Sequence, residues 1–531
     1  MKTLINIVFF FLLSSSFVAK AQFVNNQREL IDIQHYTFDI EISDTSDRIN
    51  AKATLNLLIK KKTKNFFLNL KSLNKDGKGM CIKSIKTKKG NPLAFTHKED
   101  ILVITNKKKW KKNKIIELEI AYSGIPEDGL YIRKSIYNKK TFFGDNWPNR
   151  AQYWLPVIDH PSDKATVDFI ITAPKHFTVI ASGKLISEKA LTKIKNIFHF
   201  QTEQPLPTKV MVLGAADFKI KQLDTINSIP VSSWIYQEAP DKGFDDYKPA
   251  VAVLKFYDSI IGPYSYTKLA NVQSKTRFGG MENAGNIFYY EESVNGKNQI
   301  ESLVAHEVAH QWFGNSVTEK NWRDIWLSEG FATYLTDIYL EYKYGKEKLK
   351  ERMIMEREKV IKYSKKPNVQ AIVYNEKENL FKLLNRNSYE KGAWVLHMLR
   401  TKIGDDKFFE ILRNFYSQYK NSNASTEDFI EIVNSVTQQD LNSFFDQWLY
   451  RTDIPTLQIN WKIEGGKFIL DIKQQNKPYN LDLLIKSYDK NTHQIFKIAL
   501  TKQNQHFEFP TSVKSKDAQV IIDPEVTVLF Q

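Results

Sequence analysis

Cysteine is almost absent from this sequence, and so are long apolar runs. Cys81 is the only cysteine among 531 residues, so no disulfide can form within the chain. Mean hydropathy is -0.41, and hydrophobic residues make up 42% of the chain against 26% for charged residues. These values exclude a polytopic membrane protein and predict a globular protein of several domains.

One extended apolar run lies at the N-terminus. Lys2 precedes an apolar stretch from Leu4 to Leu13, and the sequence AKA follows at 19–21. This layout predicts a secretory signal peptide at residues 1–21 that is cleaved after Ala21, because the stretch is too short to span a bilayer. An uncleaved anchor is the alternative. No cysteine lies near the cleavage site, which excludes a lipid anchor linked through cysteine. We therefore expect an exported protein, periplasmic or secreted, without a stable membrane anchor.

Positive charge is unevenly distributed. The formal net charge is +16, and much of the excess lies in the lysine-rich segment 60–89. Lysines alternate with apolar residues there, as on the solvent face of a sheet, and we favour that interpretation over attraction to anionic surfaces. Export argues against a nucleic-acid partner, so none is expected.

The character of the chain changes twice along its length. Alternating apolar residues predict strands in the first part, at 35–42, 101–105, 115–122, 165–173 and 209–218. Helical periodicity replaces this pattern near Pro240, and strands return after Pro455. The sequence therefore predicts a multidomain α+β protein with a β domain at 22–238, an α-rich domain at 239–452 and a short β domain at 453–531.

Two of the ten histidines, His306 and His310, lie four residues apart. On a helix this spacing brings both imidazoles to nearly the same face, while Glu307 is rotated away from them. The arrangement is the H-E-x-x-H motif, in which the histidines bind a metal ion and the glutamate takes a proton from metal-bound water. By chance the motif occurs in about one in a hundred chains of this length, so a third ligand is needed to support it.

Glu329 is the candidate third ligand. We expect the first helix to end at Gly314 and Asn315, and a second helix to start near Ser328, its expected cap. Glu329 then lies on the first turn, 19 residues after His310, and antiparallel helices would bring it back to the histidines. A His-His-Glu site with its fourth position open is typical of catalytic zinc. Taken alone, Glu329 would be an ordinary acid of a first helical turn.

Two further segments carry polar groups suited to peptide chemistry. Gly279 and Gly280 allow the backbone to approach a ligand, and an extended segment there could pair with a substrate backbone next to Glu282. In isolation this segment is better interpreted as a glycine-rich turn with a solvated acid. Tyr389 opens a predicted helix, and a phenol near a metal can donate to an oxyanion. Most of the 24 tyrosines must nevertheless be packing residues.

Together these segments resemble the aminopeptidase N family of zinc metallopeptidases, the gluzincin aminopeptidases of peptidase family M1. The family combines a G-x-M-E-N segment with H-E-x-x-H and a glutamate 19 residues on, and here these are GGMEN at 279–283, HEVAH at 306–310 and Glu329. The segments NWRDIWLSEGFATYL, SYEKGAWVLHML and YWLPVIDHPSDKATVDF also resemble family blocks. The resemblance covers most of residues 145–400.

The resemblance implies a saddle-like N-terminal β domain, a thermolysin-like catalytic domain and a small C-terminal β-sandwich. It also implies an aminopeptidase that binds one Zn²⁺ per chain and releases single amino acids from peptides with a free N-terminus. The implied roles are proton transfer by Glu307, oxyanion stabilisation by Tyr389 and amine binding by Glu282. The implied site residues are the zinc ligands His306, His310 and Glu329, and the substrate-binding residues Gly279, Gly280, Met281, Glu282 and Asn283.

Some features depart from the family pattern or stay open. Ala284 stands where relatives commonly have an aromatic residue, and we expect the helical domain that roofs the site in larger relatives to be missing here. A second amine-binding residue in the N-terminal domain could be Asp145, Asn146 or Gln152. Asp324 could orient a ligand histidine or lie on the surface. A metalloendopeptidase and a non-catalytic exported peptide-binding protein are the competing functions, and the oligomeric state is not predicted.

Overall fold

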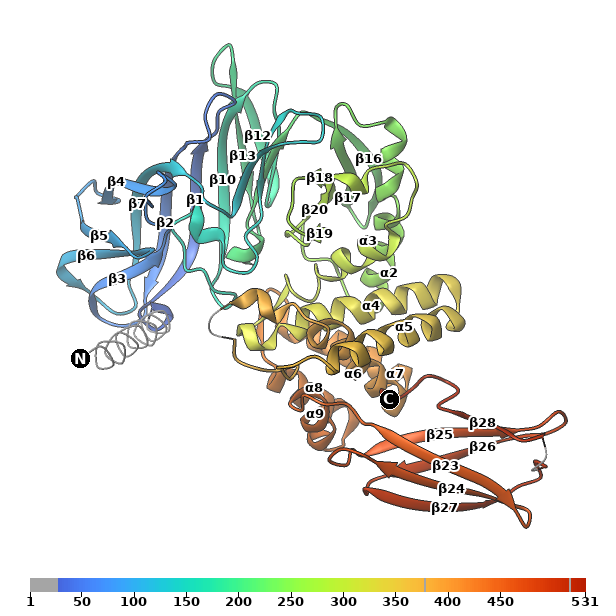
Figure 1. Cartoon of the computed structure of the whole chain (residues 1–531). Coiled ribbons are helices and arrows are strands. Elements are labelled where there is room, and N and C mark those ends of the chain that lie inside the picture. The colour runs from blue at the N-terminus through green and yellow to red at the C-terminus, as the bar shows by residue number, and fades with distance from the viewer. Residues whose placement is uncertain (1–26, 377–378, 515–516) are drawn as a thin grey trace, which may run out of the picture. The chain divides into compact units, whose positions relative to one another are not determined.

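The computed structural model describes residues 27–376, 379–514 and 517–531 (Figure 1). The predicted signal peptide lies outside the described residues. The chain forms two compact units. The first contains the described residues up to Ala252 together with Ser265–Leu303, and the second contains Val253–Tyr264 and Val304–Gln531. The domain boundaries expected at 238 and 452 stay a prediction.

A large sheet dominates the first unit. Its strands lie in the order β12-β13-β10-β1-β2-β7-β4, and the short β14 also pairs with β10. Strand β1 pairs in parallel with β10 and antiparallel with β2. Tyr36, Phe38 and Ile40 point from β1 into the core and are fully buried, as the alternating sequence predicts. The strands are β1 (Ile31–Glu41), β2 (Ile49–Ile59), β4 (Gly79–Thr87), β7 (Ile115–Ile125), β10 (Lys164–Pro174), β12 (Lys184–Ala190), β13 (Lys195–Gln201) and β14 (Leu206–Pro207).

Two smaller sheets complete the N-terminal β region. One has the order β3-β6-β5 and the other β11-β15-β9-β8. The segment expected to form one strand at 209–218 is instead divided, because a short 3-10 helix at Thr208–Val210 precedes β15. The strands are β3 (Thr63–Asn69), β5 (Ala94–Lys98), β6 (Ile101–Trp110), β8 (Leu130–Lys134), β9 (Lys140–Gly144), β11 (Thr178–Ala181) and β15 (Leu213–Ala216).

A mixed five-stranded sheet also belongs to the first unit. Its order is β16-β17-β18-β20-β19, so β19 is an edge strand that pairs only with β20 among the described strands. Strands β17, β18 and β20 run parallel to one another. The strands are β16 (Phe218–Ile226), β17 (Ile229–Tyr236), β18 (Leu269–Ser274), β19 (Gly280–Met281) and β20 (Asn286–Tyr290). Three of them therefore lie inside the region expected to be α-rich.

Helices form most of the rest of that α-rich region. Ser425 forms a capping box, because its side chain accepts from the backbone of Asp428 and the Asp428 side chain accepts from the Ser425 backbone. The buried apolar residues of α7 recur with helical spacing, at Phe408, Ile411, Leu412 and Phe415. The helices are α2 (Pro249–Ile260), α3 (Glu301–Ala309), α4 (Trp326–Tyr344), α5 (Lys346–Ser364), α6 (Gly392–Ile403), α7 (Asp405–Tyr419), α8 (Thr426–Thr437) and α9 (Asn442–Leu449).

The C-terminal strands form two three-stranded sheets, β23-β24-β27 and β26-β25-β28. Phe468 of one sheet and Phe496 of the other stack with their ring centroids 5.1 Å apart, so the two sheets pack face to face. Arg357 of α5 fixes this sandwich to the helices by donating to the carboxylate of Asp523 and the carbonyl of Val528, each at 2.7 Å. The strands are β23 (Leu457–Glu464), β24 (Lys467–Gln474), β25 (Leu481–Tyr488), β26 (His493–Leu500), β27 (Asn504–Pro510) and β28 (Gln519–Ile522).

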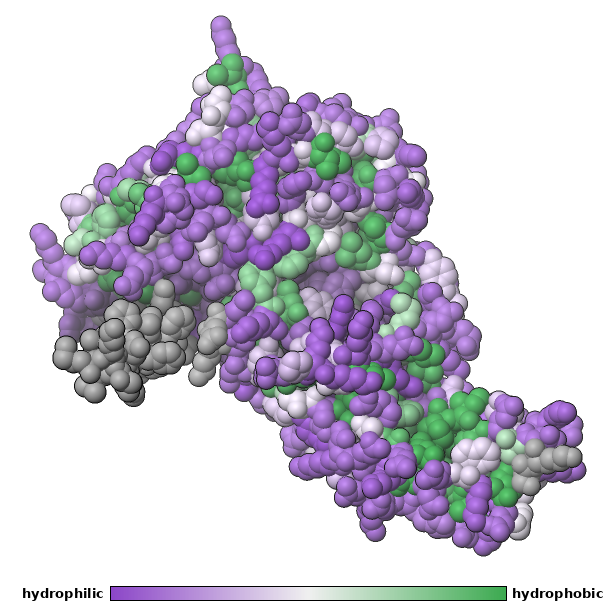
Figure 2. Space-filling view, viewed as in Figure 1, coloured by the Kyte–Doolittle hydropathy of each residue, from purple (hydrophilic) through white to green (hydrophobic). Residues whose placement is uncertain are grey.

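The fold agrees with the predicted α+β class and with a strand-rich C-terminal region. Among the described residues, no helix is both long enough and apolar enough to cross a membrane. The face shown in Figure 2 is mostly hydrophilic, in keeping with the low mean hydropathy.

Candidate active site

Three side chains of the second unit converge as the sequence predicts. The Nε2 atoms of His306 and His310 are 3.1 Å apart. The Oε2 atom of Glu329 lies 3.6 Å from Nε2 of His306 and 3.4 Å from Nε2 of His310. These atoms all lie within 4.8 Å of one another, which is close enough for one metal ion to contact all three.

The two histidines keep helical spacing even though α3 is shorter than expected. The helix ends at Ala309 rather than at Gly314 and Asn315. The backbone N–H of His310 still donates to the carbonyl of His306 at 3.3 Å, which is the bond of one more helical turn. Both imidazoles therefore lie on one face, although His310 itself begins the following turn.

Two groups contact the ring of His310 at Nδ1, the nitrogen that faces away from the other candidate ligands. Its Nδ1 lies 3.2 Å from the carbonyl oxygen of Phe313 and 3.0 Å from the hydroxyl of Ser328. Since a carbonyl can only accept, Nδ1 carries the proton and Nε2 keeps a lone pair for a metal. Gly314 has a φ of +124°, and a Cβ there would collide with the Ser328 hydroxyl. A glycine at this position therefore permits the contact between Ser328 and His310.

Ser328 is not the helix cap that the sequence suggested. Helix α4 begins at Trp326, so Ser328 lies inside its first turn, and no side chain caps this helix. The prediction rested on the usual preference of serine near a helix start to bind backbone N–H groups. It was wrong because the helix begins two residues before Ser328. Here the hydroxyl contacts a metal-ligand candidate instead, which is the role of an outer partner that fixes ring orientation.

Glu329 and Tyr389 come from helices that approach one another closely. A Cβ added to Gly330 would lie 3.0 Å from the Cα of Gly392, so the two glycines allow α4 and α6 to pack almost backbone to backbone. Glu329 directly precedes one of these glycines, and Tyr389 lies three residues before the other. The close approach explains how residues 60 positions apart in the sequence reach one site.

The electrostatics of the site suit a cation. Burial lowers the pKa of His306, and hydrogen bonding to Glu329 opposes this shift only in part, so the imidazole is neutral near pH 7. Burial alone would raise the pKa of Glu329, but the two histidines hold it well below its usual range. Two neutral imidazoles and one ionised carboxylate are a donor set that fits zinc.

Glu307 and Tyr389 flank these ligands. Glu307 follows His306 on α3 and is 5% exposed. The ring of Tyr389 stacks on that of His306, with centroids 6.0 Å apart and planes inclined by 14°. Tyr389 lies in a π-helical turn, Asn387–Lys391, which leads into α6. Such turns are often found at functional sites, because the wider turn displaces one side chain from the helical position.

The GGMEN segment, described within the first unit, forms the edge strand β19. Gly280 pairs with Tyr289 and Met281 with Phe288, and no described strand pairs with the other edge of β19. Glu282 follows directly and is 6% exposed. The geometry therefore agrees with the expected extended segment rather than with a glycine-rich turn and a solvated acid.

Asp145 holds the loop that leads into this edge strand. Its carboxylate accepts from the Thr276 hydroxyl at 3.1 Å and from the Arg277 backbone N–H at 3.0 Å. The same carboxylate forms a buried ion pair with Arg150. Both oxygens are thus used, and Asp145 is a structural residue of this loop, which sequence reasoning did not anticipate.

The other two candidates for a second amine-binding residue, Asn146 and Gln152, differ in how many of their side-chain hydrogen bonds are already formed. Asn146 donates to the carbonyls of Thr208 and Met211 and accepts from the indole N–H of Trp154, so its amide is fully used. The side chain of Gln152 forms one hydrogen bond among the described residues, in which Nε2 donates to the carbonyl of Asn149 at 2.7 Å. Gln152 therefore stays the candidate whose side-chain oxygen has no partner among the described residues.

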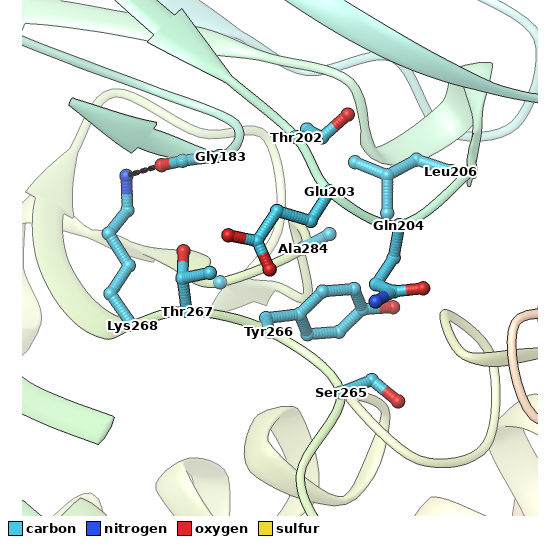
Figure 3. A pocket seen from close by; sticks show the side chains of 11 residues that line it. Gly183, Thr202, Glu203, Gln204, Leu206, Ser265, Tyr266, Thr267, Lys268 and Ala284 are labelled. Carbon is cyan, nitrogen blue, oxygen red and sulfur yellow. Dashed lines mark hydrogen bonds between the residues drawn. The ribbon is translucent and has the colours of Figure 1, made fainter. Parts of the chain in front are cut away.

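A small pocket adjoins the other end of the GGMEN segment, at Ala284 and Gly285 (Figure 3). Lys268 lies beside it and donates through Nζ to the carbonyls of Ala181 at 2.8 Å and Gly183 at 2.5 Å. Burial lowers the pKa of Lys268 to about 7. Asn286 of β20 also donates to the carbonyl of Ala181, at 3.0 Å, so the side chains of Lys268 and Asn286 both bind the segment 181–183.

Asp324 takes neither of its expected roles. It is fully buried rather than on the surface, and its carboxylate accepts from the hydroxyl of Thr426 at 2.7 Å and from the Thr426 backbone at 3.3 Å. Asp324 thus anchors the start of α8, whereas the Ser328 hydroxyl contacts Nδ1 of His310.

Two family models match this chain: the Peptidase M1 N-terminal domain at residues 33–210 and the Peptidase family M1 domain at residues 247–448. Glutamyl aminopeptidase of Bos taurus is 27% identical over 347 residues, which is 62% of this chain and 36% of that protein. Probable aminopeptidase 2 of Sulfurisphaera tokodaii is 27% identical over 444 residues, covering 80% and 54%. The chain spans about half or less of the length of these relatives.

Solved structures show the same fold. An M1 zinc metallopeptidase from Deinococcus radiodurans superposes with a TM-score of 0.68 at 22% identity, covering 80% of this chain and 94% of that one. A variant of that enzyme bound to a Tyr-Ser-Ala substrate gives a TM-score of 0.69 at 22% identity, covering 80% and 95%. With both family models matched in sequence order and the fold shared, this chain belongs to peptidase family M1.

Proposed function

We propose that this protein is a zinc-dependent aminopeptidase that hydrolyses the N-terminal peptide bond of peptides and releases single amino acids. The observation that carries the proposal is the convergence of His306, His310 and Glu329 within 4.8 Å, next to the buried Glu307 and the ring of Tyr389. A scaffold for binding alone needs none of these groups together. The proposal includes one zinc per chain and export by the N-terminal segment.

Zinc held by His306, His310 and Glu329 would act as a Lewis acid that polarises the scissile carbonyl and makes water a better nucleophile. Glu307 accepts a proton from the attacking water and delivers it to the departing amine. The Tyr389 phenol donates a hydrogen bond to the carbonyl oxygen as negative charge develops there. Burial of Glu307 and Glu329 excludes bulk water and strengthens these interactions.

Recognition of the peptide N-terminus is assigned to the GGMEN segment. An extended substrate adds to the open edge of β19 through backbone hydrogen bonds, for which Gly279 and Gly280 leave room. The carboxylate of Glu282 pairs with the free ammonium group and so sets the cut one residue into the peptide. Met281 and Asn283 complete the segment, and the buried amide of Asn283 has no partner among the described residues.

Acetylation of a peptide's N-terminus should reduce kcat/KM by about a hundred- to thousandfold, because it leaves the carboxylate of Glu282 without its partner. The measurement compares one peptide with and without the acetyl group under the same conditions. The Glu282→Gln variant serves as the control, since it lacks the charge that distinguishes the two peptides and should cleave them at more similar rates.

The same experiment separates exopeptidase from endopeptidase action. Mass spectrometry of the products should show loss of single residues from the free N-terminus. Equal cleavage of both peptides at internal bonds would reject the aminopeptidase proposal in favour of a metalloendopeptidase with the same zinc ligands.

Removing the hydroxyl of Ser328 should weaken zinc binding by about ten- to a hundredfold, because this hydroxyl helps to fix the ring of His310. Competition between Ser328→Ala and a chelator of known affinity measures the change. The matched control is Thr333→Ala on the same helix, whose hydroxyl donates to the backbone of Glu329 at 2.7 Å and contacts no ligand side chain. Equal zinc affinity in all three proteins would contradict the role given to Ser328.

A further inference from the structure

Nearly all of the net positive charge lies in one short part of the chain. Residues 60–114 contain eighteen lysines, no arginine and three acidic residues, Asp76, Glu99 and Asp100. Their net charge is +15, whereas the whole chain carries +16, so all the other residues together carry +1. Seventeen of these lysines are exposed, and only Lys71 is partly covered. This distribution creates a strong local positive potential on the first unit.

Strand pairing gathers ten of these lysines at one corner of the N-terminal β region. Thr63 of β3 pairs with Trp110 of β6, and the backbone N–H of Ile59 donates to the carbonyl of Lys114 at 2.9 Å. The start of β3 therefore lies against the end of β6 and the loop to β7, and β3 and β6 lie side by side in Figure 1. We call this group the lysine corner: Lys60, Lys61, Lys62, Lys64, Lys107, Lys108, Lys109, Lys111, Lys112 and Lys114.

A bulge pushes part of the lysine corner outward. The register of β3 and β6 shifts between Thr63 and Asn65, so that residues 106–109 have no directly paired residue on β3. Lys107, Lys108 and Lys109 occupy this bulge, and all three are exposed. A bulge of this kind disrupts the ladder locally and re-aims side chains. Here it presents three consecutive lysines.

The lysine corner has little internal charge compensation. Lys61 pairs with Glu29 at 2.7 Å, and Lys60 donates to the carbonyl of Arg28. The other eight form no ion pair with any residue that the structure describes. An ordinary solvated face intersperses both signs of charge, whereas segments 60–64 and 107–114 contain no acidic residue. Like charges held this close repel one another, which favours an external anionic partner.

An apolar side chain lies beside the lysine corner. Ile115 directly follows Lys114, begins β7 and is 68% exposed. Its strand partner is Leu58, two residues before Lys60, so the register fixes Ile115 beside the corner. Lysines around an exposed aliphatic side chain suit a lipid bilayer, where ammonium groups meet headgroup phosphates and the aliphatic group meets the acyl boundary. Base recognition in duplex DNA most often uses bidentate arginine, and single-strand sites use stacking aromatics, whereas the lysine corner as defined contains neither.

We propose that the lysine corner, with Ile115, is a docking surface for an anionic phospholipid bilayer. The attraction is reversible and screened by salt, because the Debye length at physiological ionic strength is about 8 Å. Each lysine near an anionic surface strengthens binding about fivefold. The proposal is independent of the peptidase site, and its test does not depend on peptidase activity.

The test is co-sedimentation with phosphatidylcholine vesicles that contain or lack phosphatidylglycerol, at low and high salt. It uses the chain from Gln22, which contains every described residue and lacks the apolar N-terminal segment. This protein should bind only the anionic vesicles and should dissociate at high salt. A variant with Lys107, Lys108, Lys109, Lys111 and Lys112 changed to Gln should bind at least about a hundredfold more weakly.

A matched control changes five exposed lysines of the C-terminal sandwich to Gln: Lys473, Lys477, Lys490, Lys497 and Lys502. It loses the same net charge, so vesicle binding should stay near that of the unmodified chain. Ile115→Ser, which removes an exposed side chain without disturbing the core, should weaken binding to vesicles severalfold but leave binding to duplex DNA unchanged. Melting temperatures identify any variant that fails to fold.

Three outcomes would overturn the proposal. The first is an unmodified chain that does not bind anionic vesicles at low salt. The second is equal loss of binding in the corner and sandwich variants, which would mean that net charge alone matters. The third is binding to vesicles that does not depend on Ile115 together with tighter binding to duplex DNA, which would assign the corner to soluble polyanions.

Discussion

Glu307→Gln should lower kcat by about a hundred- to ten-thousandfold while zinc content and melting temperature stay unchanged. Glutamine fills the same volume but cannot accept the proton of the attacking water. Glu307 is 5% exposed and lies one residue after His306, so its side chain is fixed by the same helical turn. Steady-state kinetics, zinc analysis and thermal melting on one preparation measure all three quantities.

The matched control is Glu301→Gln at the start of the same helix α3. It makes the same chemical change away from the zinc ligands and should alter kcat little, with a loss of stability of about 0.3–1 kcal/mol from the helix dipole. Near-normal turnover in Glu307→Gln would remove this residue from its role in proton transfer. A loss of zinc in that variant would show instead that Glu307 supports the metal site.

Local sequence patterns predicted much of the fold. The apolar alternation of Tyr36, Phe38 and Ile40 predicted β1, because one face of a strand in an antiparallel or mixed sheet packs on the core. Helical spacing predicted α4 and α5 for a similar reason. Sheet membership was harder, because β1 pairs with β10 across more than a hundred residues and no local pattern specifies that partner. The sequence also did not indicate that β18–β20 interrupt the helical region.

The zinc ligands were predictable because their spacing is short and periodic. His306 and His310 lie one turn apart, and Glu329 lies at the start of the next long helix. The residue that contacts His310 from outside the ligand set, Ser328, was not predictable in the same way. Ser328 reaches His310 only because the turn after α3 folds back and Gly314 adopts a positive φ that leaves room for the hydroxyl. The serine's place near the helix start instead suggested a cap.

The residues around the GGMEN segment were also beyond sequence reasoning. Asp145 looked like a candidate for amine binding because it is an acid in the expected part of the chain. In the structure Arg150, Thr276 and Arg277 use both of its oxygens, and Thr276 and Arg277 lie 131 and 132 positions further along the chain. The ion pair between Asp145 and Arg150 is buried only because the tertiary structure covers it. In the sequence it is no more than two charged residues five positions apart, which does not indicate a buried pair.

Tyr389→Phe should lower kcat by about a hundred- to thousandfold, which is typical when one donor to an oxyanion is removed. The phenol gains its contact only as negative charge develops on the reacting oxygen, so turnover should change more than substrate binding. The Michaelis constant should therefore stay within severalfold of its original value. The ring itself remains, so its stacking on His306 and the π-helical turn should be kept, together with zinc content.

Tyr334→Phe provides the comparison that separates catalysis from packing. The Tyr334 hydroxyl lies 2.9 Å from Nδ1 of His397 in the core of the same unit, so its loss should cost about 1 kcal/mol of stability. Its turnover should stay close to that of the unmodified enzyme. If both phenylalanine variants lose only stability, Tyr389 is a packing residue and its role in oxyanion stabilisation is wrong. If Tyr389→Phe alone loses turnover at constant zinc content and constant melting temperature, the phenol acts on the reacting oxygen.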